Sequence, residues 1–287
     1  MIDQLREEYP VRQLCAVLDC SPSTYDYPSQ AMSDENLITA IEDILMRWPF
    51  YGYRRVLKQR QRQGWLVGET RARRVLKEMG HTVKVGRVRM RTTASSHPHW
   101  RYPNLLKHVT PKYPDHVWVA DITYVRLREE FVFLAVVLDA YSRRLIGWEL
   151  DRTLEASLTL AALRMALSRR TVSPGLVHHS DRGVQYASRD YTDLLKSHGV
   201  QISMSRKGNP WDNAACESFL KTLKYEEVYR SEYRDLAEAR ASIRQFLEQV
   251  YNRKRLHSGL GYVPPVEFEA HLAAKRNEEA ATRRLGS

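Results

Sequence analysis

Three acidic residues occupy positions where a charged side chain is costly unless it has a partner. Asp121 interrupts an apolar strand predicted over residues 117–125, Asp181 directly follows a second predicted strand, and Glu217 lies in a helical segment among apolar neighbours. Core-facing carboxylates need a pairing group or a metal. Mg²⁺ prefers such oxygens, and clustered acids accommodate two ions. Two ions activate the attacking oxygen and stabilise the leaving oxygen in phosphoryl transfer.

Each acid also has an ordinary explanation when it is considered alone. An aspartate at a strand end commonly caps a turn, and a glutamate in a helix is usually solvated. Only the three residues together indicate catalysis, so the chemistry depends on a fold that brings them into one site.

The distribution of charge along the chain indicates a polyanionic partner. Residues 1–46 carry a net charge of −7, residues 47–112 carry +15 and the remaining residues carry +3. A long basic stretch fits nucleic acid, because each neutralised phosphate releases condensed counterions. The alternative is a solvated basic face, which is the usual role of a short charged run.

Helical periodicity predicts small helical units before residue 83. Residues 9–18 carry an apolar stripe, and Ser21 followed by Pro22 is typical of a helix start, so the segment fits a helix-turn-helix or any other small helical hairpin. Residues 33–46, 53–63 and 69–79 predict three amphipathic helices. From these helices and the basic stretch that follows, we expect DNA contacts by Arg54, Arg55, Lys58, Arg71, Arg73, Arg74, Lys84, Arg87, Arg89 and Arg91.

From residue 117 the pattern becomes that of an α/β domain. The predicted strands cover residues 117–125, 131–138, 144–150, 176–180 and 201–205, and the predicted helices cover residues 154–169, 188–198, 212–229 and 236–256. Three strands followed by alternating helices and strands predict a mixed five-stranded sheet with flanking helices.

These residues resemble a known family, the second-reading-frame product of bacterial transposases of the insertion-sequence-three family. The matching segments are residues 118–124, 139–143, 179–186 and 205–214, with a closing segment that contains Tyr251, Asn252, Arg255, His257, Leu260 and Pro264. Asp181 and Glu217 have 35 residues between them, as the family pattern requires, and Lys224 follows seven residues after Glu217. The similarity extends from about residue 9 to residue 270.

The resemblance implies a ribonuclease-H-like integrase core preceded by small all-helical DNA-binding domains. It implies that Asp121, Asp181 and Glu217 are the catalytic triad and the ligands of two Mg²⁺ ions, for which Mn²⁺ can substitute, and that Lys224 contacts DNA near the reacting phosphate. Without the motif, Lys224 would be read as an ordinary exposed lysine. Besides these metal ions, we expect no nucleotide cofactor, because the sequence lacks a Gly-x-x-x-x-Gly-Lys motif.

The predicted domain organisation has five parts. They are a helix-turn-helix-like segment at residues 1–30, a basic three-helix DNA-binding domain at 31–82, a basic linker at 83–112, the catalytic core at 113–232 and a helical extension at 233–287.

Other matched residues leave alternatives open. Asp139 and Arg143 either close the site or form a turn that Asp139 caps. Strand alternation predicts that one of His178 and His179 is buried and the other exposed, and a core histidine is the better interpretation of either. Trp211, in the loop of residues 208–211, either stacks on a base or packs.

The implied reaction is DNA hydrolysis at an element end, followed by transfer of the exposed 3′-hydroxyl to another phosphodiester. The expected partners are terminal-repeat and target DNA, further copies of the chain on paired ends, and the upstream-frame product, because this chain starts with its own Met1 and has no heptad repeat. The rival interpretations are a nuclease of the same fold without strand transfer, and a DNA-binding regulator with a vestigial core.

Composition excludes several other classes. The longest apolar run, residues 131–138, is too short to span a bilayer. Three cysteines do not form a disulfide framework or a four-ligand zinc site. We expect a cytoplasmic protein that associates with the nucleoid when it is bound to DNA.

Overall fold

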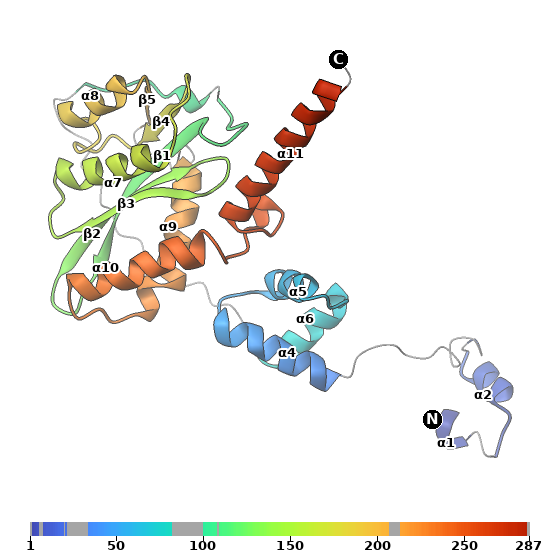
Figure 1. The fold of residues 1–287 in the computed structure, drawn as a ribbon. Coiled ribbons are helices and arrows are strands. Elements are labelled where there is room, and N and C mark those ends of the chain that lie inside the picture. The colour runs from blue at the N-terminus through green and yellow to red at the C-terminus, as the bar shows by residue number, and fades with distance from the viewer. Residues whose placement is uncertain are drawn as a thin grey trace. The chain divides into compact units, whose positions relative to one another are not determined.

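The chain folds into two compact units, Met1–Thr82 and Val83–Ser287. The computed structural model describes residues 2–5, 8–19, 21, 34–81, 100–107, 109–206 and 213–285. Figure 1 shows the helical first unit in blue and cyan, and the sheet with its surrounding helices in green to red.

Three amphipathic helices make the body of the first unit. They are α4 (Asp34–Arg47), α5 (Tyr53–Arg62) and α6 (Glu69–Glu78), and their ends agree with the predicted ranges within a residue or two. Their apolar stripes bury Ile41, Val56 and Val75 completely, so each helix is held by the other two.

The first residues of the chain form two short helices. Helix α2 (Val11–Val17) confirms the predicted helical stripe and buries Cys15, whereas α1 (Ile2–Leu5) was not predicted. The second helix of the predicted helix-turn-helix, which would start at Pro22, lies outside the described residues.

A mixed five-stranded sheet organises the second unit, as predicted. Its strands are β1 (Val117–Arg126), β2 (Phe131–Asp139), β3 (Leu145–Asp151), β4 (Val177–Ser180) and β5 (Gln201–Met204). Their order is β3-β2-β1-β4-β5, with β1 to β3 antiparallel and β1, β4 and β5 parallel. Short turns join the antiparallel strands, while helix α7 (Ala156–Arg169) leads from β3 to β4 and helix α8 (Arg189–Ser197) leads from β4 to β5.

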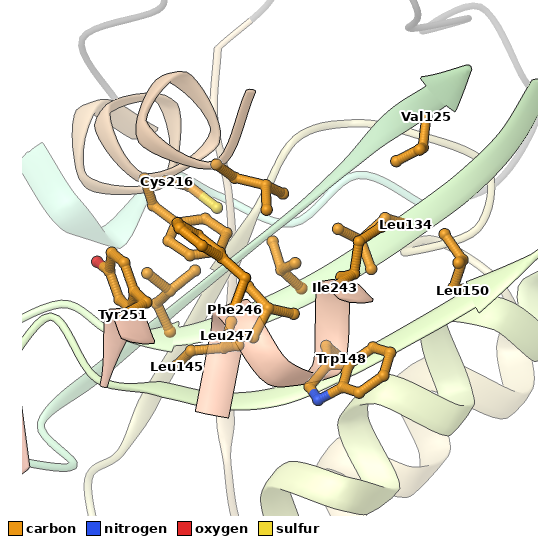
Figure 2. Close-up of a cluster of buried hydrophobic side chains, with 14 of the residues drawn as sticks. Val125, Leu134, Leu145, Trp148, Leu150, Cys216, Ile243, Phe246, Leu247 and Tyr251 are labelled. Atoms are coloured by element: carbon orange, nitrogen blue, oxygen red, sulfur yellow. The ribbon is translucent and has the colours of Figure 1, made fainter. Parts of the chain in front are cut away.

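Alternate residues of β1 build two cores. Trp118 and Ala120 pack with α7 and α8 on one face. Val117 and Val119 pack on the other face with helices α9 (Ala214–Glu226) and α10 (Leu236–Gln245) and with the π-helical turn η4 (Phe246–Tyr251). Figure 2 shows this second core, in which aromatic and aliphatic side chains of α10 and η4 lie against the strands.

The C-terminal part differs from the prediction in two ways. The helix predicted over residues 236–256 changes at Phe246 to a π-helical turn, in which the Asn252 N–H donates to the Leu247 carbonyl at 3.3 Å. The wider turn keeps Phe246, Leu247 and Tyr251 buried in the second core. The predicted boundary at residue 232 is therefore not a boundary of the hydrophobic core.

A long helix, α11 (Pro265–Leu285), lies within the predicted helical extension, but its bounds were not predicted because its apolar residues are sparse after Leu272. The remaining one-turn helices are η1 (Leu105–Lys107), η3 (Val228–Arg230) and η5 (Ser258–Leu260).

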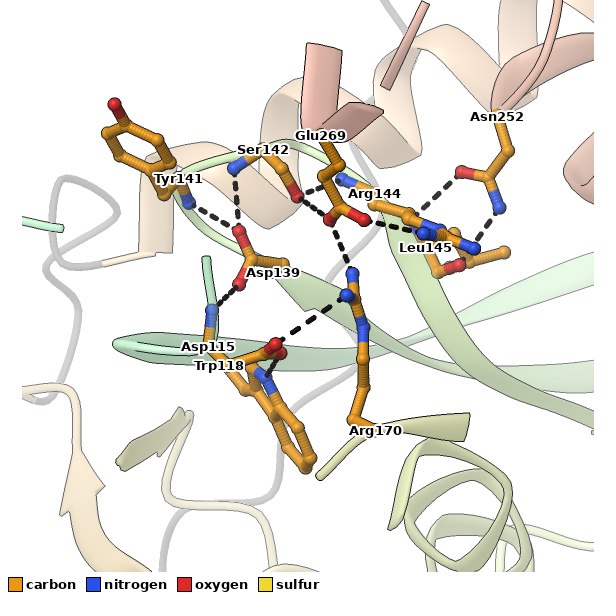
Figure 3. A network of polar contacts seen from close by, with 10 residues as sticks. All are labelled: Asp115, Trp118, Asp139, Tyr141, Ser142, Arg144, Leu145, Arg170, Asn252 and Glu269. Carbon is orange, nitrogen blue, oxygen red and sulfur yellow. Dashed lines mark hydrogen bonds and ion pairs between the residues drawn. The ribbon is translucent and has the colours of Figure 1, made fainter. Parts of the chain in front are cut away.

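A polar network ties α11 to the sheet (Figure 3). Glu269 of α11 accepts hydrogen bonds from Ser142 at 2.6 Å, Arg144 at 2.5 Å and Arg170 at 2.5 Å. Although burial opposes its charge, the contacts with Arg170, Ser142 and Arg144 lower the pKa of Glu269. The network joins the helix to the β2–β3 turn, and within it the charge of Glu269 is balanced by arginine side chains.

The β2–β3 turn resolves the two interpretations of Asp139 in favour of the cap. Its carboxylate accepts the backbone N–H groups of Asp115 at 2.5 Å, Tyr141 at 3.0 Å and Ser142 at 2.6 Å. Arg143 follows in the left-handed region with φ of 60°. Asp139 is therefore a buried structural residue of the turn.

Candidate active site

Asp121 lies on β1 just beyond the point at which this strand separates from β4. The two strands pair over residues 117–119, whereas β1 pairs with β2 from residue 118 to residue 126. The Asp121 carboxylate accepts the Ile122 N–H at 2.8 Å. At Asp121, β1 is therefore held by β2 on one side and no longer pairs with β4 on the other.

Asp181 reaches the same place from the end of β4. Because β1 and β4 are parallel, their carboxyl ends lie at one edge of the sheet. Asp181 and Asp121 both line a cavity of about 160 Å³, together with Gln185. The Gly183 N–H donates to Asp181 Oδ1 at 2.8 Å, and a Cβ atom at residue 183 would lie 3.0 Å from that oxygen. Glycine therefore permits the turn that holds Asp181.

Glu217 comes from the first turn of α9, with its side chain exposed. The start of α9 is tied to β1 next to Asp121, because the buried Asn213 side chain donates to the Ala120 carbonyl at 3.2 Å. Cys216 and Phe219 bury the opposite face of the helix. The sheet and α9 thus bring the third acid toward the first two.

The electrostatics couple Asp121 to the other two acids. Burial raises the pKa of Asp121 most, the Asp181 charge raises it next and the Glu217 charge adds the smallest contribution, so that the pKa reaches about 7 against the Ile122 hydrogen bond. Burial also raises the pKa of Glu217. Among the described residues, no three acidic, histidine or cysteine side chains are close enough together to hold one metal ion. Asp181 and Glu217 therefore lie near enough to Asp121 to disfavour its charge, but the three side chains are not gathered into one set of metal ligands.

Lys224 lies on the same helix as Glu217, with its ammonium nitrogen 3.5 Å from the centre of the Tyr124 ring. Burial lowers the pKa of Lys224 to about 8. The side chain is therefore partly withdrawn from water and held against an aromatic face, unlike an ordinary exposed lysine.

The two histidines before Asp181 are both in the core, so the prediction that one is exposed was wrong. Strand β4 lies between β1 and β5 and is covered on both faces, which buries both sides of the strand. His178 pairs with the Tyr191 hydroxyl at 3.0 Å and His179 with the Ser203 hydroxyl at 2.8 Å. Both are core residues, which confirms the alternative interpretation.

The basic residues of the first unit have different environments. Arg71 and Arg74 both contact Asp34, at 2.9 and 2.7 Å, and Arg73 contacts Glu69 at 2.8 Å. Arg54 is exposed beside Tyr53. Arg55 and Lys58 are half-buried on α5. The predicted DNA contacts at Lys84, Arg87, Arg89 and Arg91 lie outside the described residues, as does Trp211.

Sequence reasoning did not assign roles to several residues that position α9. Besides Asn213, Arg255 forms an ion pair with Glu226 at 2.6 Å, and both side chains are only 5% exposed. Tyr124 supports Lys224. Asn213, Arg255 and Tyr124 all stand in the matched motifs, but only their contacts in the fold show what they do.

Comparison with known proteins places this geometry in a family. Two models described as "Integrase core domain" match residues 111–210 and 198–265, which include all three acids. The chain is 38% identical over 263 residues to the uncharacterized 31 kDa protein of insertion element IS600 of Shigella sonnei, covering 89% of this chain and 97% of that protein. It is 33% identical over 294 residues to the transposase of IS629 of Shigella sonnei, covering 98% and 99%.

The chain belongs to the transposases of bacterial insertion sequences. It therefore functions in insertion-sequence transposition and is an enzyme of the polynucleotidyl-transferase type. The transposase InsF of IS3A from Escherichia coli K12 is 42% identical over 156 residues, 54% of each chain.

Among solved structures, the catalytic core of bovine immunodeficiency virus (BIV) integrase aligns at 19% identity with a TM-score of 0.41, over 57% of this chain and 99% of that one. No helix in the described parts of this transposase is long and apolar enough to cross a membrane.

Proposed function

We propose that this transposase cleaves DNA at the ends of its insertion sequence and transfers the freed 3′-hydroxyl to another phosphodiester, using Asp121, Asp181 and Glu217. The observation that carries the proposal is that Asp121 and Asp181 line one cavity, where burial and then the charges of Asp181 and Glu217 raise the pKa of Asp121 to about 7. Like charges gathered at one edge of a sheet favour a cation there.

The chemistry of the donor groups fits Mg²⁺ or Mn²⁺. Asp121 and Asp181 line one cavity, Glu217 lies within electrostatic range, and carboxylate oxygens are the ligands that these hard cations prefer. The three carboxylates would hold the metal, with Glu217 moving toward the two aspartates. Two bound ions would activate the attacking oxygen and stabilise the leaving one.

The protein supplies position and charge. The backbone N–H groups of Ile122 and Gly183 orient the Asp121 and Asp181 carboxylates. Lys224 is mostly protonated at neutral pH, since its pKa is about 8, so it can hold a DNA phosphate near Glu217. No covalent protein intermediate is required.

We further propose that the first unit binds DNA through α5 and α6. Arg54 is exposed for this role, while Arg71, Arg73 and Arg74 would exchange a carboxylate for a phosphate. Lys58 and Arg55 lie on the same helix as Arg54. Transposition joins two element ends, so we expect several copies of the chain on paired-end DNA, which a mass measurement of the complex would test.

The test is a strand-transfer assay with labelled terminal-repeat duplexes and Mg²⁺ or Mn²⁺. Asp181→Asn should abolish joined products, whereas Asp193→Asn, on the exposed face of α8, should leave them unchanged. Cleavage without joining, also when the upstream-frame product is added, would establish a nuclease instead. Specific DNA binding without any metal-dependent cleavage would establish a regulator.

A further inference from the structure

A second, larger hollow shares one residue with the candidate active site. It has a volume of about 770 Å³ and lies between the β1–β2 hairpin and the turn from α9 to η3. Tyr124 lines both this hollow and the small cavity of Asp121 and Asp181. Lys224, on the same helix as Glu217, also lines the hollow. We call this hollow the hairpin groove.

Aromatic rings from two different elements line the hairpin groove. Phe131 of the hairpin is 49% exposed and Tyr229 of η3 is 51% exposed. Each is braced by a second ring, Phe131 by Tyr124 and Tyr229 by Tyr225, both edge-on at 5.7 Å between centroids. Two large rings are thus held in place while about half of each remains in water, where an apolar surface is unfavourable.

The charge of the hairpin groove is predominantly positive. Its lining contains Lys224, Arg126, Arg128 and Arg234, against Glu232. Arg234 is paired with Glu238 at 3.0 Å. Arg126 and Arg128 are exposed, and neither forms an ion pair within the described parts of the chain. The groove therefore offers flat apolar faces beside cationic side chains.

We propose that the hairpin groove binds unpaired nucleotides of the DNA substrate, with bases stacked on Phe131 and Tyr229 and phosphates beside Arg126 and Arg128. Positively charged grooves with aromatic faces are the general means of holding a single strand, because every base has a face that can stack. A closed duplex offers no such faces, since its bases are already stacked on one another. The proposal rests on the proposed function for the identity of the substrate.

Binding to tailed DNA tests the proposal without catalysis. The full chain is titrated, without Mg²⁺ or Mn²⁺, into a blunt terminal-repeat duplex and into the same duplex with a short unpaired tail that contains 2-aminopurine. Wild type should bind the tailed duplex more tightly and quench the 2-aminopurine. Phe131→Ala and Tyr229→Ala should each weaken tailed binding about tenfold, as expected for one lost stacking contact, and leave blunt binding unchanged.

Two further variants separate stacking from folding. Tyr229→Phe keeps the ring and should retain tailed binding. Tyr113→Ala removes a 41% exposed ring that does not line the groove and should have no effect. Equal losses on blunt and tailed DNA, or no loss in either groove variant, would overturn the proposal. Self-association lost in Tyr229→Ala, with tailed binding intact, would assign the groove to a second copy of the chain and also overturn it.

The assay distinguishes this proposal from the proposed function. If wild type joins strands in the presence of metal but the groove variants bind tailed DNA normally, only the groove assignment is wrong. If the groove variants lose tailed binding while wild type shows no metal-dependent cleavage, the groove assignment stands and the catalytic proposal is wrong.

Discussion

The second unit contains carboxylates in two opposite surroundings, a first group around Glu269 and a second group around Asp121. Glu269 receives its hydrogen bonds from Ser142 and two arginines, and its pKa is lowered. Asp121 lies near two further acids, and its pKa is raised to about 7. In the first group the protein itself neutralises the charge, so the group stabilises the fold. In the second group, among the described residues, the Ile122 hydrogen bond is the one contact that favours the Asp121 charge, against burial and two negative neighbours, which agrees with the proposed metal site.

The largest expected effect is on catalysis at the second group. Asp121→Asn should lower strand transfer about a thousandfold, because metal ligation supplies several kcal/mol to the transition state. The same change should leave the metal-free melting temperature unchanged or higher, since it removes a repelling charge. Joined-product rates and thermal unfolding in a chelator measure both. If Asp121→Asn strongly lowered the melting temperature without metal, the Asp121 charge would stabilise the fold as the Glu269 charge does, and the contrast between the two groups would be wrong.

The opposite result is expected at the first group. Glu269→Gln should lower the free energy of unfolding of the second unit by about 3 kcal/mol, because it leaves the mostly buried Arg170 and the partly exposed Arg144 without their carboxylate. Urea unfolding measures this loss. Glu238→Gln, which breaks an exposed pair with Arg234, should change stability by less than about 1 kcal/mol. Strand transfer per folded molecule should be unaffected in both variants.

Gly183→Ala should sharpen the site assignment with a smaller effect. The new Cβ would lie 3.0 Å from Asp181 Oδ1 and 3.1 Å from the Gln185 side-chain oxygen, so the Asp181 carboxylate must shift. We expect strand transfer to fall roughly tenfold, as a small misplacement of a reacting group does, while the melting temperature stays within a few degrees. Gly259→Ala, where a Cβ meets open space and φ is not positive, as at Gly183, controls for the general effect of replacing glycine by alanine. If Gly183→Ala transfers strands at the wild-type rate, the position of the Asp181 carboxylate does not matter for catalysis, and its assignment is wrong.

The smallest expected effect concerns the pH dependence of Lys224. Its pKa in the folded chain, about 8, is below the ordinary lysine value of 10.5, so the unfolded chain binds more protons between these values. Lys224 therefore costs stability at neutral pH, and that cost decreases as pH rises from 8 to 10.5. Lys224→Met should be more stable than wild type at pH 7 and should lose this advantage at pH 10. A constant difference across this range, measured by urea unfolding, would contradict the shift.

The fold was predictable where a pattern repeats over many residues. The strands and α7 showed their periods clearly, so the mixed sheet could be derived from the order of elements. The bounds of helix α11 and the π-helical turn could not be predicted in this way. Helix α11 is mostly exposed, and the turn depends on the packing of Phe246, Leu247 and Tyr251 against the sheet.

The identity of the candidate site residues could be predicted from the sequence, but their arrangement in space could not. All three acids could be singled out by their positions in predicted elements, and the family motif then joined Asp121, Asp181 and Glu217 into one triad. The prediction that one of His178 and His179 is exposed was wrong because alternation assumes one solvated face, and β4 has none. The hairpin groove combines residues about a hundred positions apart, which no local pattern could reveal.

Helix α9 is held at both ends, at its start by Asn213 on the Ala120 carbonyl and at its end by the buried pair of Glu226 and Arg255. These two contacts fix the position and direction of α9 relative to the sheet. Seven residues of helix separate Glu217 from Lys224, a rise of about 10 Å, which corresponds to about three base steps of 3.4 Å along a DNA strand. A phosphate bound by Lys224 would thus lie a fixed number of nucleotides from the phosphodiester bond that is cut beside Glu217.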